Sequence, residues 1–195
     1  MSSSKPRGQY PKGAERRSQI IRTATDVFAT EGFEGTALKR VAEMVGVKEP
    51  TLFHYFRGKQ ELLTAVLSER DRRSVEAPTK DDGSLPLIVR TAEKNRHEPG
   101  LTALYAVASA TAIDPEHDSH SYFKHRYAEV VDALAEDIRR RQAAGEARQD
   151  LPPRDLARMV VALSDGLQLQ WLYDREVDMA AGLSQFIDVL LKPAQ

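Results

Sequence analysis

The stretch LKRVAEMVGVKEPTLFHYF, residues 38–56, decides the fold of this chain. Its first part carries apolar residues at the i, i+3, i+4 and i+7 spacing of one helix face: Leu38, Val41, Ala42 and Val45. Gly46 then breaks the helix, and a second short helix is predicted over 48–55, with Pro50 in its first turn, where a missing N–H costs nothing. Two short helices joined by a tight glycine turn form a helix-turn-helix, which presents the start of its second helix to the major groove of DNA.

Helical periodicity continues on both sides of this stretch, and no convincing period-2 strand or internal repeat is found. The pattern therefore predicts an all-α fold, with a three-helix head and a six-helix body. We expect a flexible basic arm over 1–13, a helix-turn-helix domain over 14–60 and a body over 61–195. Helices are predicted over about 14–30, 38–45, 48–55, 58–77, 86–97, 101–113, 116–144, 155–173 and 179–191.

Three consecutive segments carry a family resemblance: RSQIIRTATDVFATEGF at 17–33, TALKRVAEMVGV at 36–47 and TLFHYFRGKQELL at 51–63. They resemble the first helix, the second helix with its turn, and the recognition helix with the start of the fourth helix in TetR-family regulators. The resemblance implies a bacterial transcriptional regulator, a homodimer that binds a palindromic operator as a repressor and is released by a small-molecule effector. Activation in place of repression stays open.

The resemblance also implies which residues of the head contact DNA. The start of the second helix, either Thr36 as a side-chain cap or the neighbouring backbone, would meet a phosphate, and Lys59 would meet another. The full predicted set is Thr36, Lys48, Glu49, Pro50, Thr51, His54, Tyr55 and Lys59. Lys48, Pro50 and Phe53 depart from the usual Ser or Thr, Gly and Tyr, which affects the operator sequence more than the binding mode. Leu52, Phe53 and Phe56 are predicted to lie in the core.

Charge and composition agree with a head that meets a polyanion. Residues 1–60 hold eleven Lys and Arg against six Asp and Glu, a formal +5, whereas the remainder is −6 within a total of −1. The chain has no cysteine, which excludes disulfides, thiolate zinc sites and cysteine nucleophiles and fits a cytoplasmic location. No apolar run approaches the roughly 20 residues of a membrane span, and the polar N-terminus does not resemble a secretory signal.

The body carries candidates for ligand binding and for dimerisation. Aromatic and polar residues of the sixth to eighth helices are expected to line a pocket: Tyr105, Tyr122, Phe123, Tyr127, Gln168 and Trp171. The alternative is that these residues form closed core. The family pairs its last two helices with their copies, which assigns a dimer interface to Met179, Leu183, Phe186, Ile187 and Leu190, and some of these residues must also bury against the protomer's own core.

Other functions find less support. Asp114, His117, Asp118, His120 and His125 are possible metal ligands, but their spacing matches no compact site, and neither a metal nor a cofactor is predicted. Glycine-rich phosphate loops, nucleophile elbows and paired zinc-binding histidines are lacking from the sequence, so an enzyme is not predicted. The remaining alternative is a helical binding protein or enzyme whose head no longer binds DNA.

Overall fold

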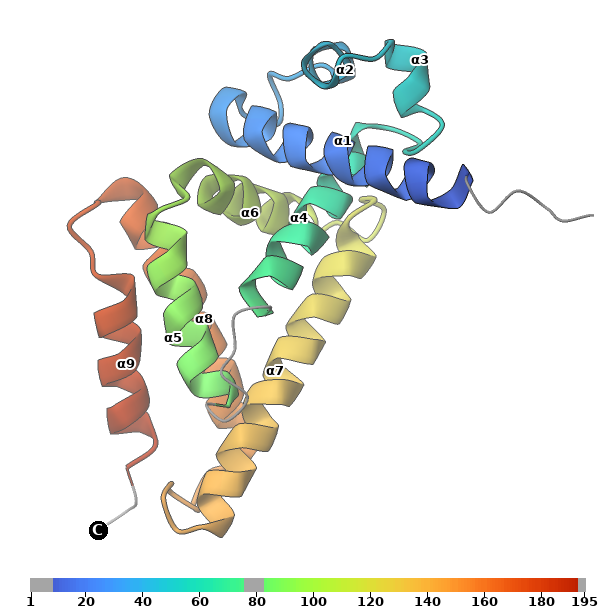
Figure 1. Cartoon of the computed structure of the whole chain (residues 1–195). Helices are drawn as coiled ribbons and strands as arrows, with labels where there is room; N and C mark the ends of the chain where they lie inside the picture. The colour runs from blue at the N-terminus through green and yellow to red at the C-terminus, as the bar shows by residue number, and fades with distance from the viewer. Residues whose placement is uncertain (1–8, 76–82, 193–195) are drawn as a thin grey trace, which may run out of the picture. The chain divides into compact units, whose positions relative to one another are not determined.

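The computed structural model describes residues 9–75 and 83–192. Within these ranges every regular element is an α-helix and no strand occurs, which confirms the all-α prediction. The chain divides into two compact units, Met1–Asp71 and Arg72–Gln195. Figure 1 shows the helices coloured along the chain.

The first unit is built from α1 (Gln9–Glu31), α2 (Leu38–Val45), α3 (Glu49–Leu52) and most of α4 (Lys59–Val75). Helix α1 begins at Gln9, earlier than the predicted residue 14, and Pro11 falls in its first turn, where its missing N–H costs nothing. The apolar faces predicted from periodicity are buried, and their central members are Ile20, Phe28, Val41, Leu62 and Val66.

Helix α4 crosses the division between the units. The sequence places the boundary after residue 60, whereas the compact units divide after Asp71. The first half of α4 contributes buried Leu62, Leu63, Val66 and Leu67, so an uninterrupted helix leads from one unit into the other.

Two glycines shape the turns of the first unit as predicted. Gly32 and Gly46 have φ of +79° and +77°, a left-handed conformation that ends α1 and α2 and that side chains with a Cβ rarely adopt. The predicted cap of α2 is wrong, because Ala37 occupies the N-cap position and makes no side-chain cap. The Thr36 hydroxyl instead donates to the Gly32 carbonyl oxygen at 2.6 Å, which links the end of α1 to the residue before the N-cap of α2.

The second unit contains α5 (Ser84–Arg96), α6 (Pro99–Thr111), α7 (His120–Ala143), α8 (Pro153–Tyr173) and α9 (Met179–Leu190). Helices α7 and α8 pack along each other in antiparallel directions, since Tyr127 pairs with Asp165 whereas Asp132, further along α7, pairs with Arg154 near the start of α8. Helix α9 packs on α8 and α5, as the red and green helices in Figure 1 show.

Helix α7 begins at His120, later than predicted. Local hydrogen bonds hold the preceding segment in turns: the Asp114 carboxylate accepts the Glu116 N–H at 3.0 Å, and His117 Nδ1 accepts the Ser119 N–H at 3.1 Å. Such side-chain acceptors compete with the helix for backbone donors.

Among the described residues, no helix is long and apolar enough to cross a membrane.

Candidate functional site

The helix-turn-helix of the first unit is held together by a glycine turn. At the end of α2, the Val47 N–H donates to the Ala42 carbonyl oxygen at 3.0 Å and the Gly46 N–H donates to that of Glu43 at 3.1 Å. This pair of bonds is the pattern of a left-handed glycine cap. The chain then leaves α2 in a fixed direction and enters α3 with little freedom at the turn.

Helix α3 is shorter than the predicted 48–55. Regular α-helix ends at Leu52, and the chain continues in tighter turns in which the Tyr55 N–H donates to the Leu52 carbonyl oxygen at 2.9 Å. Lys48 is the N-cap residue in an extended conformation, without a side-chain cap, and proline lies in the first turn. The segment therefore exposes its first residues on a short, stiff turn.

The predicted DNA-binding residues differ in exposure. Lys48, Pro50 and His54 are exposed, and Glu49, Thr51, Tyr55 and Lys59 are half-buried. Thr36 is only 2% exposed, and its hydroxyl already donates to the Gly32 carbonyl oxygen.

Lys59 is held by two contacts at the start of α4. Its Nζ lies 4.3 Å from the centroid of the Phe33 ring and donates to the Glu34 carbonyl oxygen at 3.2 Å. An ammonium group carries three donors and no acceptor, so these contacts orient the charge and leave donor capacity for a phosphate.

The aromatic segment after α3 is divided between core and surface. Leu52 and Phe56 are buried, as predicted, but the core prediction for Phe53 is wrong, because its side chain is 52% exposed. Arg17 of α1 was missed by the sequence analysis, and its guanidinium lies 4.9 Å from the centroid of the Phe56 ring. This contact places a further cation beside the segment that follows α3.

In the second unit, three of the predicted ligand-binding residues form one aromatic cluster. The Phe123 ring centroid lies 5.6 Å from that of Tyr105 and 5.0 Å from that of Tyr122. Arg126 donates to the Tyr105 hydroxyl at 2.7 Å and its guanidinium lies 4.7 Å from the centroid of the same ring. The α6–α7 packing thus joins three aromatic rings and one cation.

Tyr127 connects this cluster to α8. Its hydroxyl donates to Asp165 at 2.8 Å, and burial, followed by the neighbouring Tyr105 and Asp165, raises the pKa of Tyr127 far above its ordinary value. Gln168, one turn along α8, accepts from the Asn95 amide at 3.1 Å, and both side chains are buried. Asp165, Asn95 and Arg126 were not anticipated, since their partners lie far away in sequence.

Trp171 lies in a different environment from the aromatic cluster. It is buried in the core with Met179 and Leu183, and the Arg175 guanidinium lies 3.9 Å from its ring centroid.

The possible metal ligands among residues 114–125 do not come together in one site. Among the described residues, no three His, Cys, Asp or Glu side chains are placed to hold a metal ion.

Comparisons with known proteins agree with this arrangement. The family model of bacterial regulatory proteins of the tetR family matches residues 20–66, and that of the C-terminal domain of BetI-type transcriptional repressors matches residues 96–192. The transcriptional activator FasR of Mycolicibacterium smegmatis is 30% identical over 186 residues, which cover 88% of this chain and 80% of FasR. The chain belongs to the TetR family.

Two further relatives support this TetR-family assignment. The transcriptional repressor AcnR of Corynebacterium diphtheriae is 28% identical over 155 residues, covering 77% of this chain and 78% of AcnR. A solved TetR-family regulator from Rhodococcus sp. superimposes with a TM-score of 0.75 at 25% identity, covering 92% of this chain and all of that one. The chain is thus a DNA-binding transcriptional regulator of the TetR type.

Burial in the single chain divides the α9 residues that are predicted to form the dimer interface. Met179, Leu183 and Ile187 lie in the protomer's own core, and only Phe186 and Leu190 are half-buried. The exposed large apolar residues of the second unit are Val107 and Ile113 in and after α6, three on α8 and one on α9: Met159, Leu169, Tyr173 and Val189. Met159, Leu169 and Tyr173 lie on one side of α8 with half-buried Leu163 and Gly166, a stripe that the sequence analysis did not single out.

Proposed function

We propose that two copies of this chain bind a palindromic operator as a repressor and release it when a small molecule binds the second unit. The observation that carries the proposal is the helix-turn-helix of the first unit, in which a left-handed Gly46 turn presents exposed Lys48 and Pro50. Repression is the outcome named for AcnR, whereas FasR is named an activator. Expression of a reporter gene placed behind the operator distinguishes repression from activation.

In the proposed complex, some residues of the first unit would contact base edges and others would contact phosphates. Lys48 and Pro50 would contact base edges, where a cation suits guanine acceptors and an apolar ring suits a thymine methyl. His54, Tyr55 and Lys59 would contact phosphates, which position the protein without reading sequence. In a dimer, the two recognition segments must lie about one DNA turn apart, roughly 34–36 Å.

The experiment is fluorescence anisotropy against an operator selected from random DNA. Affinity should fall steeply with salt because neutralised phosphates release counterions. Lys59→Ala should weaken binding to all sequences alike, whereas Lys48→Ala should change the preferred bases. Lys124→Ala removes an exposed lysine of the second unit and serves as the control. Salt-independent binding, or equal effects of all three variants, would contradict the proposal.

The dimer is proposed to form through the exposed apolar stripe of α8 together with α9. Met159, Leu169 and Tyr173 are 43%, 52% and 89% exposed in the single chain. Contiguous apolar surface of this kind marks interaction sites. Gly182 lets α9 approach Leu167 of α8 closely, since a Cβ there would lie 3.4 Å from Leu167 Cδ1, so the two helices can act as one face.

The release of DNA on ligand binding would follow from a population shift. A ligand lowers DNA affinity only by its differential affinity for the two states. Helix α4, which crosses the division between the units, is the proposed connection. Trp171 is the chain's single tryptophan, so its fluorescence reports ligand binding in the second unit.

The ligand experiment titrates aromatic metabolites and hydrophobic drugs while fluorescence and operator binding are followed together. Compounds that release DNA should change the Trp171 signal, and Tyr127→Ala and Gln168→Ala should weaken their effect. If a releasing compound acts equally on both variants, the proposed ligand region is wrong, although operator binding can still stand.

A further inference from the structure

Arg17 continues the buried side of α1 by one turn. The residues four, seven and eleven positions after it are Ile21, Ala24 and Phe28, all buried, and this spacing places them on the same side of the helix as Arg17. An arginine in such a position packs its alkyl stem along apolar surface and keeps its charged head in water. Arg17 is exposed, and its guanidinium lies 4.9 Å from the centroid of the buried Phe56 ring.

The ring beside Arg17 belongs to the segment that is proposed to contact the DNA backbone. Phe56 directly follows exposed His54 and half-buried Tyr55, the two proposed phosphate contacts after α3. The ring contact joins α1 to this segment, although the two are far apart in sequence. A positive charge from α1 is therefore held next to side chains that would meet phosphates.

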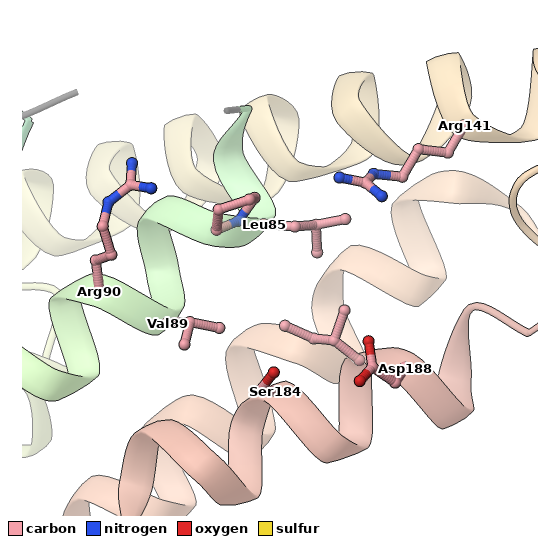
Figure 2. A pocket seen from close by; sticks show the side chains of 8 residues that line it. Leu85, Val89, Arg90, Arg141, Ser184 and Asp188 are labelled. Carbon is pink, nitrogen blue, oxygen red and sulfur yellow. The ribbon is translucent and has the colours of Figure 1, made fainter. Parts of the chain in front are cut away.

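The charge of Arg17 is not neutralised within the protein. In the part of the chain that the structure describes, Arg17 makes neither a hydrogen bond nor an ion pair. Its neighbour Arg16 donates to Gln19 at 2.9 Å. Arg141 of α7, which Figure 2 shows beside a groove between α5 and α9, pairs with Asp137 at 3.6 Å. Arg17 differs from both, because no protein acceptor occupies its N–H groups.

A phosphate group suits the donors of Arg17. A guanidinium has five N–H donors in one plane, and two of them can bind two phosphate oxygens at once. The contact with Phe56 limits the positions of the side chain, so less conformational freedom is lost on binding. Lys59 is held in a similar way, with its Nζ 4.3 Å from the centroid of the Phe33 ring.

We propose that Arg17 binds a backbone phosphate of the operator and extends the DNA-binding surface of the first unit onto α1. This inference rests on the operator binding proposed above. The contact is made to the DNA backbone, so it fixes the position of the first unit on the duplex without discriminating between bases. The predicted DNA-binding residues all lie between Thr36 and Lys59, and Arg17 adds a contact from outside that range.

The salt dependence of operator binding by the full chain tests the contact. Each lost phosphate contact lowers the slope of log affinity against log salt concentration by about 0.9, so Arg17→Gln should lower it by about 1.8 for a dimer. Affinity at a fixed salt concentration should fall at least about tenfold, because hydrogen bonds to charged groups are strong. Arg17→Lys keeps the charge and should keep a slope close to that of the wild type.

Arg22→Gln is the matched control. Arg22 is an exposed arginine of the same helix, five residues further along and on a different side. Its replacement removes the same charge from the first unit and should leave the slope unchanged. Equal effects of Arg17→Gln and Arg22→Gln would show that the slope reflects only the net charge of the unit, and would overturn the proposal.

Operators in which one phosphate at a time is replaced by an uncharged methylphosphonate locate the contact. At one position in each half-site, the replacement should weaken binding by the wild type but not by Arg17→Gln. The inference alone is overturned if the wild type binds with a steep salt dependence but Arg17→Gln keeps the wild-type slope, or if every replacement affects both proteins equally. If the wild type binds no operator, the proposed function fails as well.

Thermal unfolding verifies that each variant remains folded. If Arg17→Gln lowers thermal stability, Arg17→Met takes its place in the same measurements, because it keeps an alkyl stem beside Phe56 and removes the charge.

Discussion

Replacing Gly83 by alanine tests the joint between α5 and α7. Gly83 precedes α5 with φ of +76° and ψ of −179°, a backbone region almost restricted to glycine. A Cβ at this position would lie 2.4 Å from Asp137 Oδ2 and 2.8 Å from Asp137 Cγ. Asp137 cannot easily withdraw, because it is 4% exposed, accepts the Leu85 N–H and pairs with Arg140.

The destabilisation has two parts. The backbone conformation costs about 1–3 kcal/mol for a residue with a Cβ. Displacing the Asp137 carboxylate removes a tertiary cap and a buried hydrogen bond, which adds about 1–2 kcal/mol. Gly83→Ala should therefore lower the free energy of unfolding by about 2–5 kcal/mol, measured by urea denaturation at equilibrium.

Gly145→Ala provides the matched control. Gly145 has φ of +74°, but a Cβ there would meet no atom within 4 Å, so it should show only the backbone cost, about 1–2 kcal/mol. If Gly83→Ala destabilises the protein no more than Gly145→Ala, the contact between Gly83 and Asp137 does not constrain the start of α5, and the argument fails.

Three further predictions concern the second unit. Leu169→Glu should convert the proposed dimer to monomer in sedimentation experiments, whereas Val107→Glu, at a similarly exposed apolar residue of α6, should leave assembly unchanged. Stability should fall as pH rises above about 10, because Tyr127 ionises in the unfolded chain but stays protonated in the fold, and Tyr127→Phe should flatten this dependence in pH-resolved melting curves. Gln168→Leu should cost about 1–2 kcal/mol in urea denaturation, since it removes the buried hydrogen bond with Asn95, and an unchanged stability would show that this pair is not formed.

Local patterns were sufficient for much of the fold. Apolar periodicity located the helices, and glycines located the ends of α1, α2 and α7, where Gly32, Gly46 and Gly145 have positive φ. These features depend on neighbouring residues, so they can be predicted from a short stretch of sequence. The end of α3 was missed because the aromatic residues after Leu52 fit a helix equally well.

The partner of a buried face could not be predicted in the same way. Periodicity correctly showed that Met179, Leu183 and Ile187 are buried, but it does not distinguish the protomer's own core from a second copy. Periodicity also did not separate core from surface at Phe53. This residue shares the aromatic character of buried Phe56 but lies on the surface. Polar partners separated widely in sequence, such as Asn95 with Gln168, have no local signal at all.

The buried polar pairs constrain the chemistry of an effector. Tyr127 with Asp165 joins α7 to α8, and Asn95 with Gln168 joins α5 to α8. A ligand that separated these helices would break both hydrogen bonds, and buried polar groups left without partners cost about 1–3 kcal/mol each. A purely apolar ligand would have to recover this cost from hydrophobic contact alone. An effector that enters between these helices should therefore carry its own hydrogen-bonding groups, placed to replace at least one of the two pairs while its apolar part contacts the rings of Tyr105 and Phe123.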